Sequence, residues 1–175
     1  DEYLVLYAPV FQMVLHFYRK KDSIYKAFLA SFLSLYYPFH LNNNSIIDEE
    51  IMKYVEDKSI YCRENAMLYF YRRGSTTLII NALRIISDHN LYYNKKLLAN
   101  DLLKFNGNQE ELAQKLFQEF QRFSIDFQVS IVNYLRFSKN DLNKEFYNML
   151  ISNEYDKEVN LAIIRYFGSK KYEKV

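Results

Sequence analysis

The feature that most constrains this 175-residue chain is a short pattern that returns at an almost constant interval. Each copy is a nine-residue stretch that closes on an apolar residue, and four of these closing residues are Phe70, Leu102, Leu135 and Phe167. Successive closing residues are separated by 32, 33 and 32 positions. Such an interval is typical of stacked helix pairs, in which each unit buries its apolar face only against its neighbours.

The copies differ in how well they match. The best matches occupy residues 62–70, 127–135 and 159–167, and a looser copy occupies 94–102. A further copy at 24–32 closes 38 residues before Phe70, because a polar loop lengthens the interval.

Throughout the chain, apolar residues recur with the 3.6-residue period of an α-helix, and no segment alternates as a strand does. The pattern resolves into about five antiparallel helix pairs, at residues 2–36, 46–73, 75–106, 108–138 and 140–168. The chain has three Gly and two Pro, too few for a turn-rich β fold. We therefore predict an all-α fold, with residues 1–175 forming a single repeat domain that is a fragment of a longer chain.

Helix ends are predicted at Pro38, which cannot continue a helix, and at three glycines that follow apolar stretches. These glycines are Gly74, Gly107 and Gly168. The charged tail, residues 169–175, is expected to fray or to begin a truncated repeat.

Helix starts are predicted at Ser75 and Asn108, because both side chains suit an N-cap. The acidic residues at 48–50 and 110–111 then fall in first turns, where carboxylates interact favourably with the helix dipole. We interpret them as helix stabilisers and not as paired catalytic carboxylates.

The second-helix pattern places an apolar residue first, often an Arg next, then a small residue and a terminal Leu or Phe before Gly. This pattern resembles the HEAT repeat and is most similar to the short variety common in bacterial proteins. The segments Tyr61–Gly74 and Asp156–Gly168 carry the resemblance best. Arg stands at the second place only at Arg63, where other copies have Gln128 and Asn160. The resemblance implies a right-handed α-α superhelix.

Two other architectures compete with this interpretation. The interval is shorter than the roughly 40–47 residues usual for HEAT and armadillo units and is close to the roughly 34 of tetratricopeptide repeats. The tetratricopeptide signature needs more Ala and Gly than these helices offer. An irregular helical bundle is the remaining alternative.

The sequence gives no support for catalysis. His16, His40 and His89 lie far apart, and none has a partner at helical spacing. Cys62 is the single cysteine and opens an apolar helix face, so we expect it to be buried and unreactive. One cysteine excludes a zinc motif, and three isolated glycines exclude a phosphate-binding loop. We predict no enzymatic activity, no metal and no cofactor.

The charge distribution argues against nucleic acid as the partner. The formal net charge is +2, and the basic residues form only short clusters at 19–21, 72–73, 95–96 and 170–171. The first two clusters end helices, where cations interact favourably with the dipole. Some alkylpurine DNA glycosylases are built from HEAT-like repeats, and their cleft typically relies on Trp and carboxylates. This chain has no Trp, which counts against that family, and we keep it only as the alternative.

No charged residue occurs from Tyr3 to Tyr18, but 16 residues fall short of the roughly 20 needed to span a bilayer. We interpret this segment as a buried helix. A single cysteine suits a reducing compartment, which predicts a cytoplasmic protein. An anchor upstream of Asp1 is left open.

In the HEAT family the second helices line the concave face, and the resemblance implies the same arrangement here. We therefore predict a scaffold that binds a protein or peptide on this face, with a structural spacer for an adjoining domain as a further alternative. Arg and Tyr are favoured in binding surfaces because each offers contact area and hydrogen bonds. The candidate partner-binding residues are Arg63, Tyr69, Arg72, Asn133, Arg136 and Arg165.

Overall fold

A computed structural model describes residues 23–40, 45–88, 98–138 and 142–172, and all regular secondary structure in these ranges is helical. The predicted all-α fold is therefore confirmed. In chain order the elements are α2 (Ser23–His40), α3 (Ser45–Tyr54), α4 (Ile60–Arg73), α5 (Thr76–Asp88), α6 (Leu98–Leu102), α7 (Gln109–Gln118), the 3-10 helix η1 (Phe120–Arg122), α8 (Ile125–Phe137), α9 (Asn143–Ser152) and α10 (Lys157–Tyr172).

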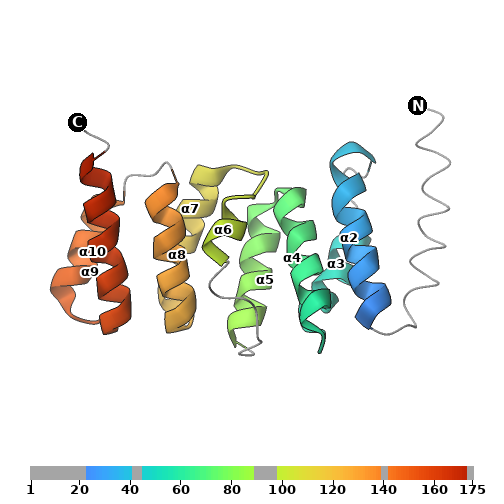
Figure 1. Cartoon of the computed structure of the whole chain (residues 1–175), viewed down its shortest axis with the longest axis horizontal. Helices are drawn as coiled ribbons and strands as arrows, with labels where there is room; N and C mark the ends of the chain where they lie inside the picture. The colour runs from blue at the N-terminus through green and yellow to red at the C-terminus, as the bar shows by residue number, and fades with distance from the viewer. Residues whose placement is uncertain (1–22, 41–44, 89–97, 139–141, 173–175) are drawn as a thin grey trace.

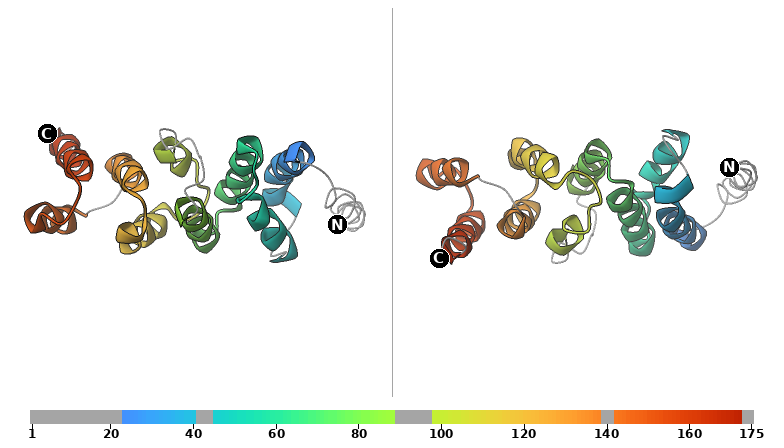
Figure 2. Two further views of the ribbon diagram at one scale, coloured as in Figure 1. Left: turned by 90° about the horizontal axis from the view of Figure 1, so that it is seen from below. Right: turned by 90° about the horizontal axis from the view of Figure 1, so that it is seen from above.

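The helices follow one another along the longest axis of the molecule, with α2 and α10 near opposite ends (Figure 1). They form two layers, which are seen end-on in Figure 2. The even-numbered helices, which we call the second helices, lie in one layer, and α3, α5, α7 and α9 lie in the other. Within the second-helix layer α2 packs on α4, α6 on α8, and α8 on α10. Between the layers α3 packs on α4 and α9 on α10.

Three predicted helix ends are wrong. We expected Pro38 to end the first pair, but α2 continues to His40. A proline in the last turn removes one backbone hydrogen bond, which costs less near a helix end than in the interior. The second error concerns Gly168, because α10 runs through it to Tyr172, and the predicted fraying of residues 169–172 is not observed. The third concerns Gly107, because α6 already ends at Leu102.

The three glycines differ in backbone conformation and in what surrounds them. Gly74 has φ 69°, and its N–H donates to the Phe70 carbonyl, so the predicted C-cap of α4 is confirmed. Gly107 does not take a positive φ, but a Cβ built on it would lie 2.2 Å from the Gly74 carbonyl oxygen. Two equivalent turns therefore touch through their backbones, and the Asn106 N–H donates to the carbonyl of Tyr71 beside them at 2.9 Å. Gly168 has neither role, because its Cβ would meet nothing within 4 Å.

The predicted helix starts are confirmed. The Asn108 side chain accepts hydrogen bonds from the N–H groups of Glu110 and Glu111 at 3.0 and 3.1 Å, as an N-cap does. Ser75 Oγ lies 3.5 Å from the N–H of Leu78, at the outer limit for the same interaction. The acidic pair 110–111 occupies the first turn of α7.

The recurring stretch keeps its register in three dimensions. We number each copy from its first residue, so that position 1 is Cys62 in α4, Phe127 in α8 and Val159 in α10. All three are buried. The Lys170 ammonium of α10 donates to the carbonyl of Ser138, which ends α8, at 3.0 Å, and both residues stand at position 12. Equal positions on these parallel helices are therefore side by side.

The copy at 24–32 is aligned incorrectly by sequence. That alignment puts Ile24 and Phe28 at buried positions, but their side chains are 75% and 61% exposed. The residues of α2 that are buried instead include Ala30 and Ser34, which stand 36 residues before Ala66 and Phe70. The first interval is thus two residues shorter than the sequence pattern indicates.

Two substitutions at position 6, one in α8 and one in α10, test this register. Val132 in α8 is fully buried, whereas Ile164, its equivalent in α10, is 55% exposed. Val132→Asp should lower the free energy of unfolding by about 3 kcal/mol or more, because it buries an unpaired charge. Ile164→Asp should change it by less than about 0.5 kcal/mol. Urea unfolding of both variants measures the difference, and equal losses would contradict the register.

The glycines give a second matched pair. Gly107→Ala should destabilise the protein by about 1–3 kcal/mol, because the added methyl group has no space beside Gly74. Gly168→Ala should stabilise it by about 1 kcal/mol, because it removes a glycine from a helix without introducing a contact. Thermal unfolding of the two variants checks the opposite signs. A shift in the same direction for both would show that one role is wrong.

Candidate functional site

In the copies on α4, α8 and α10, the side chain at position 2 donates a hydrogen bond to the turn that precedes the helix. Arg63 donates from Nη1 to the carbonyl of Asp57 at 2.5 Å, and Asn160 from Nδ2 to the carbonyl of Tyr155 at 3.1 Å. Gln128 donates from Nε2 to two carbonyls of the turn after α7, at 3.2 and 2.9 Å. Three different side chains thus make the same kind of hydrogen bond, from the start of a second helix to a carbonyl of the preceding turn.

This role corrects one candidate residue. Arg63 was expected on the exposed face of α4, but only 5% of it is exposed, and its guanidinium points into the turn. An arginine is common at binding surfaces, so its residue type suggested exposure. The sequence signal that indicates the structural role is the amide donor at the same position in Gln128 and Asn160.

Position 8 holds a tyrosine in all three copies, and all three are fully buried: Tyr69, Tyr134 and Tyr166. The Tyr69 hydroxyl donates to Asp48 at the start of α3 at 2.7 Å. The Tyr134 hydroxyl donates to Gln109 at the start of α7 at 2.6 Å, and burial raises its pKa. These bonds fix α4 against α3 and α8 against α7. Tyr69 is therefore a core residue, and its predicted exposure is wrong.

Asp57 organises the turn between α3 and α4. Its carboxylate accepts hydrogen bonds from Ser23 at 2.5 Å, from the Lys26 ammonium at 2.8 Å and from the N–H of Ser59 at 2.9 Å. Burial disfavours the charged carboxylate, but these hydrogen bonds outweigh it and lower the pKa of Asp57 below its usual value. The hydrogen bond to Asp57 likewise raises the pKa of Lys26. Both partners therefore stay charged at neutral pH, and they join α2 to the following pair.

We predict a defined pH dependence from this cluster. A carboxyl group with a folded-state pKa below its unfolded value stabilises the fold above about pH 4, and the contribution is lost as the pH falls through the folded value. Asp57→Asn should therefore cost about 1–3 kcal/mol at pH 7 and clearly less at pH 3. Urea unfolding at both pH values measures this change. A cost independent of pH would mean that the charge of Asp57 contributes nothing.

A cleft of about 520 Å³ opens beside this cluster, and its walls are formed by the turn after α3 and the first residues of α2. The ammonium of Lys26 is occupied by Asp57, and that of Lys53 lies 3.0 Å from Glu50. These two ammonium groups in the wall of the cleft are therefore paired with carboxylates of the chain. The lining residues are Ser23, Lys26, Lys53, Glu56, Asp57 and Lys58.

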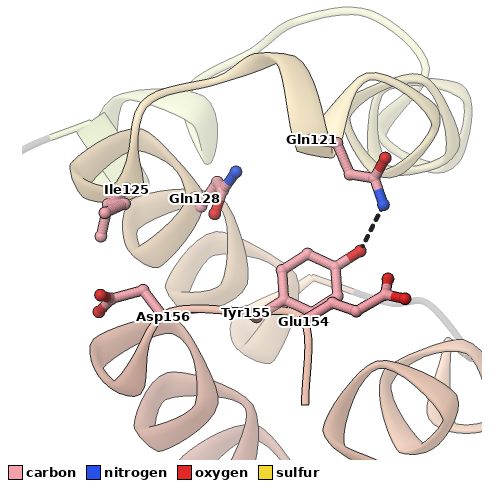
Figure 3. A pocket seen from close by; sticks show the side chains of 6 residues that line it. All are labelled: Gln121, Ile125, Gln128, Glu154, Tyr155 and Asp156. Carbon is pink, nitrogen blue, oxygen red and sulfur yellow. Dashed lines mark hydrogen bonds between the residues drawn. The ribbon is translucent and has the colours of Figure 1, made fainter. Parts of the chain in front are cut away.

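A second cleft, of about 400 Å³, lies between the turn that precedes α8 and the turn that precedes α10 (Figure 3). Gln121 and Tyr155 point toward one another across it, and the Gln121 amide donates to the tyrosine hydroxyl at 2.8 Å. Asp156 accepts from the N–H of Glu158 at 2.8 Å and so caps α10. The Gln121–Tyr155 bond joins the two turns, whereas Gln128 and Asp156 form hydrogen bonds within their own turns, and we interpret the cleft as a seam between pairs. Its lining residues are Gln121, Ile125, Gln128, Glu154, Tyr155 and Asp156.

The described residues contain no arrangement suited to catalysis that we recognise. Cys62 is buried, and burial raises the pKa of its thiol to about 12, so it is not a nucleophile at neutral pH. Within these residues no three His, Cys, Asp or Glu side chains gather as a metal site requires. His16 and His89 lie outside the described residues, as does the side chain of His40.

The remaining candidate residues stand on the exposed or half-buried side of the second helices. Arg165 is exposed, and Arg72, Asn133 and Arg136 are half-buried. Arg72 also donates from Nη1 to Ser34 Oγ of α2 at 3.2 Å. We call this surface the open face, and its residues on α4, α8 and α10 are Tyr61, Glu64, Leu68, Arg72, Asp126, Val129, Asn133, Arg136, Phe137, Glu158, Leu161 and Arg165.

Two of the basic clusters, at 19–21 and 95–96, lie outside the described residues, as does the uncharged segment Tyr3–Tyr18. Among the helices that the structure does describe, none combines the length and the apolar character that crossing a bilayer requires. Comparisons with protein-family models, with curated proteins and with solved structures found no match.

Proposed function

We propose that this chain is a non-enzymatic helical-repeat scaffold that binds a protein or peptide on its open face. We further propose that its helix pairs form a HEAT-like right-handed superhelix. Two features support this architecture, the packing of each second helix on the following one and the equal register of α8 and α10. The repeat interval is nearly constant, so equal positions of successive second helices lie level with one another and each pair can bury the apolar face of the next.

The observation that carries the binding proposal is the distribution of exposed apolar side chains. Of the twelve large hydrophobic residues that are exposed among the described residues, three lie on the open face: Tyr61, Phe137 and Leu161. Tyr61 is 72% exposed and Phe137 60% exposed, and the guanidinium carbon of Arg136 lies 4.4 Å from the centre of the Phe137 ring. Exposed apolar groups rimmed by polar ones are typical of interaction sites. Aromatic and arginine residues contribute most to the affinity of such sites.

The composition of the same face disfavours nucleic acid as the partner. Glu64, Asp126 and Glu158 stand near the N-terminal ends of the three helices, within one to three turns of the arginines. A polyanion that crossed the face would approach these carboxylates, whereas a protein partner can match both signs. The spacer alternative gives no reason for aromatic residues on the open face.

We predict that a photoreactive amino acid at position 133 will capture one specific protein when the chain is expressed in its native cells. The matched control is position 114, because Gln114 is exposed on α7 in the other layer. The cross-linked product is identified by mass spectrometry. Equal capture at both positions, or capture of nucleic acid at position 133, would contradict the proposal.

The captured partner then allows a quantitative test. Phe137→Ser should weaken its binding about tenfold or more, because the loss of an aromatic contact at an interface typically costs 1.4 kcal/mol or more. The unfolding midpoint should stay nearly unchanged, because this side chain is mostly exposed. Isothermal titration calorimetry and urea unfolding measure the two quantities.

A further inference from the structure

We infer that the part of the open face formed by Arg136, Phe137 and Arg165 binds an acidic segment of the partner. This inference rests on the proposed function and specifies the chemistry of one part of the open face. Arg136 and Phe137 lie in the last turn of α8, and Arg165 lies in the middle of α10.

Charge is distributed unevenly along the open face. Its acidic residues stand at positions 0 and 3 of the copies, and its basic residues stand at positions 7 to 11. Favourable interaction with the helix dipole accounts for part of this order, because carboxylates then lie near N-terminal ends and cations near C-terminal ends. The dipole does not explain, however, why Arg136 and Arg165 form no ion pair with the described residues.

The two arginines of the site differ from other basic residues of the second helices. Arg73 lies 3.4 Å from Asp48, Arg63 donates to a turn carbonyl, and Lys170 donates to Ser138. Within the described part of the chain, neither Arg136 nor Arg165 forms an ion pair or a hydrogen bond. Their charges are therefore available to a partner.

Arg136 is also held in place. Its guanidinium carbon lies 4.4 Å from the centre of the Phe137 ring, and its Nε is buried without a hydrogen-bond partner. A stacked guanidinium loses less conformational freedom when it binds a carboxylate, and its two-pronged geometry matches that of the carboxylate. The aromatic ring beneath it offers an apolar contact to the neighbouring residue of the same segment.

These features fit a segment that has at least two carboxylates next to an apolar residue. Phosphates share the carboxylate's affinity for guanidinium groups. A nucleic acid would, however, extend along the face toward Asp126 and Glu158, and it would not use the exposed ring of Phe137 through an aliphatic contact. A short acidic peptide satisfies both the charge and the apolar surface.

The test selects a displayed library of random 12-residue peptides against the full chain and measures the affinity of the selected peptides by fluorescence anisotropy. We expect the selected sequences to be enriched in Asp and Glu beside Leu or Phe. Arg136→Gln and Arg165→Gln should each weaken binding about fivefold, and the effect should shrink at high salt. The matched control is Lys144→Gln, which removes the same charge from an exposed position on α9 and should leave the affinity unchanged.

Phe137→Ser separates binding from folding. It should leave the unfolding midpoint nearly unchanged, because the side chain is mostly exposed, and yet it should weaken peptide binding by removing the apolar contact beside Arg136. Selected peptides without acidic enrichment, or peptides whose affinity is unchanged in the arginine variants, would overturn this inference and leave the proposed function standing. Tighter binding of a DNA oligonucleotide than of any selected peptide would overturn both.

Discussion

Each second helix has buried residues on more sides than its own first helix can cover. Seven side chains of α4 are buried, from Cys62 to Tyr71, and a similar set of α8 is buried. The first helices bury fewer side chains: three of ten in α7, two of ten in α9 and six of thirteen in α5. A second helix therefore depends on the second helices before and after it for most of its apolar burial. The exposed Ile164 shows the consequence at α10, where the structure describes no following helix.

Polar groups then fix the geometry that apolar burial alone would leave loose. At position 2 the chain keeps a side-chain donor, and at position 8 it keeps a tyrosine, although the surrounding residues differ. The donor satisfies the turn within a pair, and the tyrosine hydroxyl joins Tyr69 or Tyr134 to the start of the first helix. Because an arginine, a glutamine and an asparagine can each supply the N–H group, the motif looks degenerate by residue identity while its chemistry is constant. This explains why the repeat is recognised by its interval more easily than by its letters.

Local sequence signals predicted those features that depend on local physics. The caps at Gly74 and Asn108 need only backbone geometry and a nearby side chain, and both were predictable. The roles of Arg63 and Gly107 depend on what lies across a turn or in the next pair, which residue type and helical period do not report. The two-residue error in aligning α2 has the same origin, because burial there is set by its contacts with α4 and not by its own apolar pattern.

The arginines of the second helices illustrate how structure and binding can be separated on a repeat surface. An arginine whose donors are already satisfied inside the chain would have to break those bonds to bind a partner, which costs free energy before any new contact forms. Arg63 belongs to this group. An arginine whose guanidinium lies against an aromatic ring but makes no hydrogen bond to the described residues has no such cost, and Arg136 belongs to this second group. Residue type marks both as candidates, and only the hydrogen bonds distinguish the one that stabilises the fold from the one whose donors the described residues leave unused.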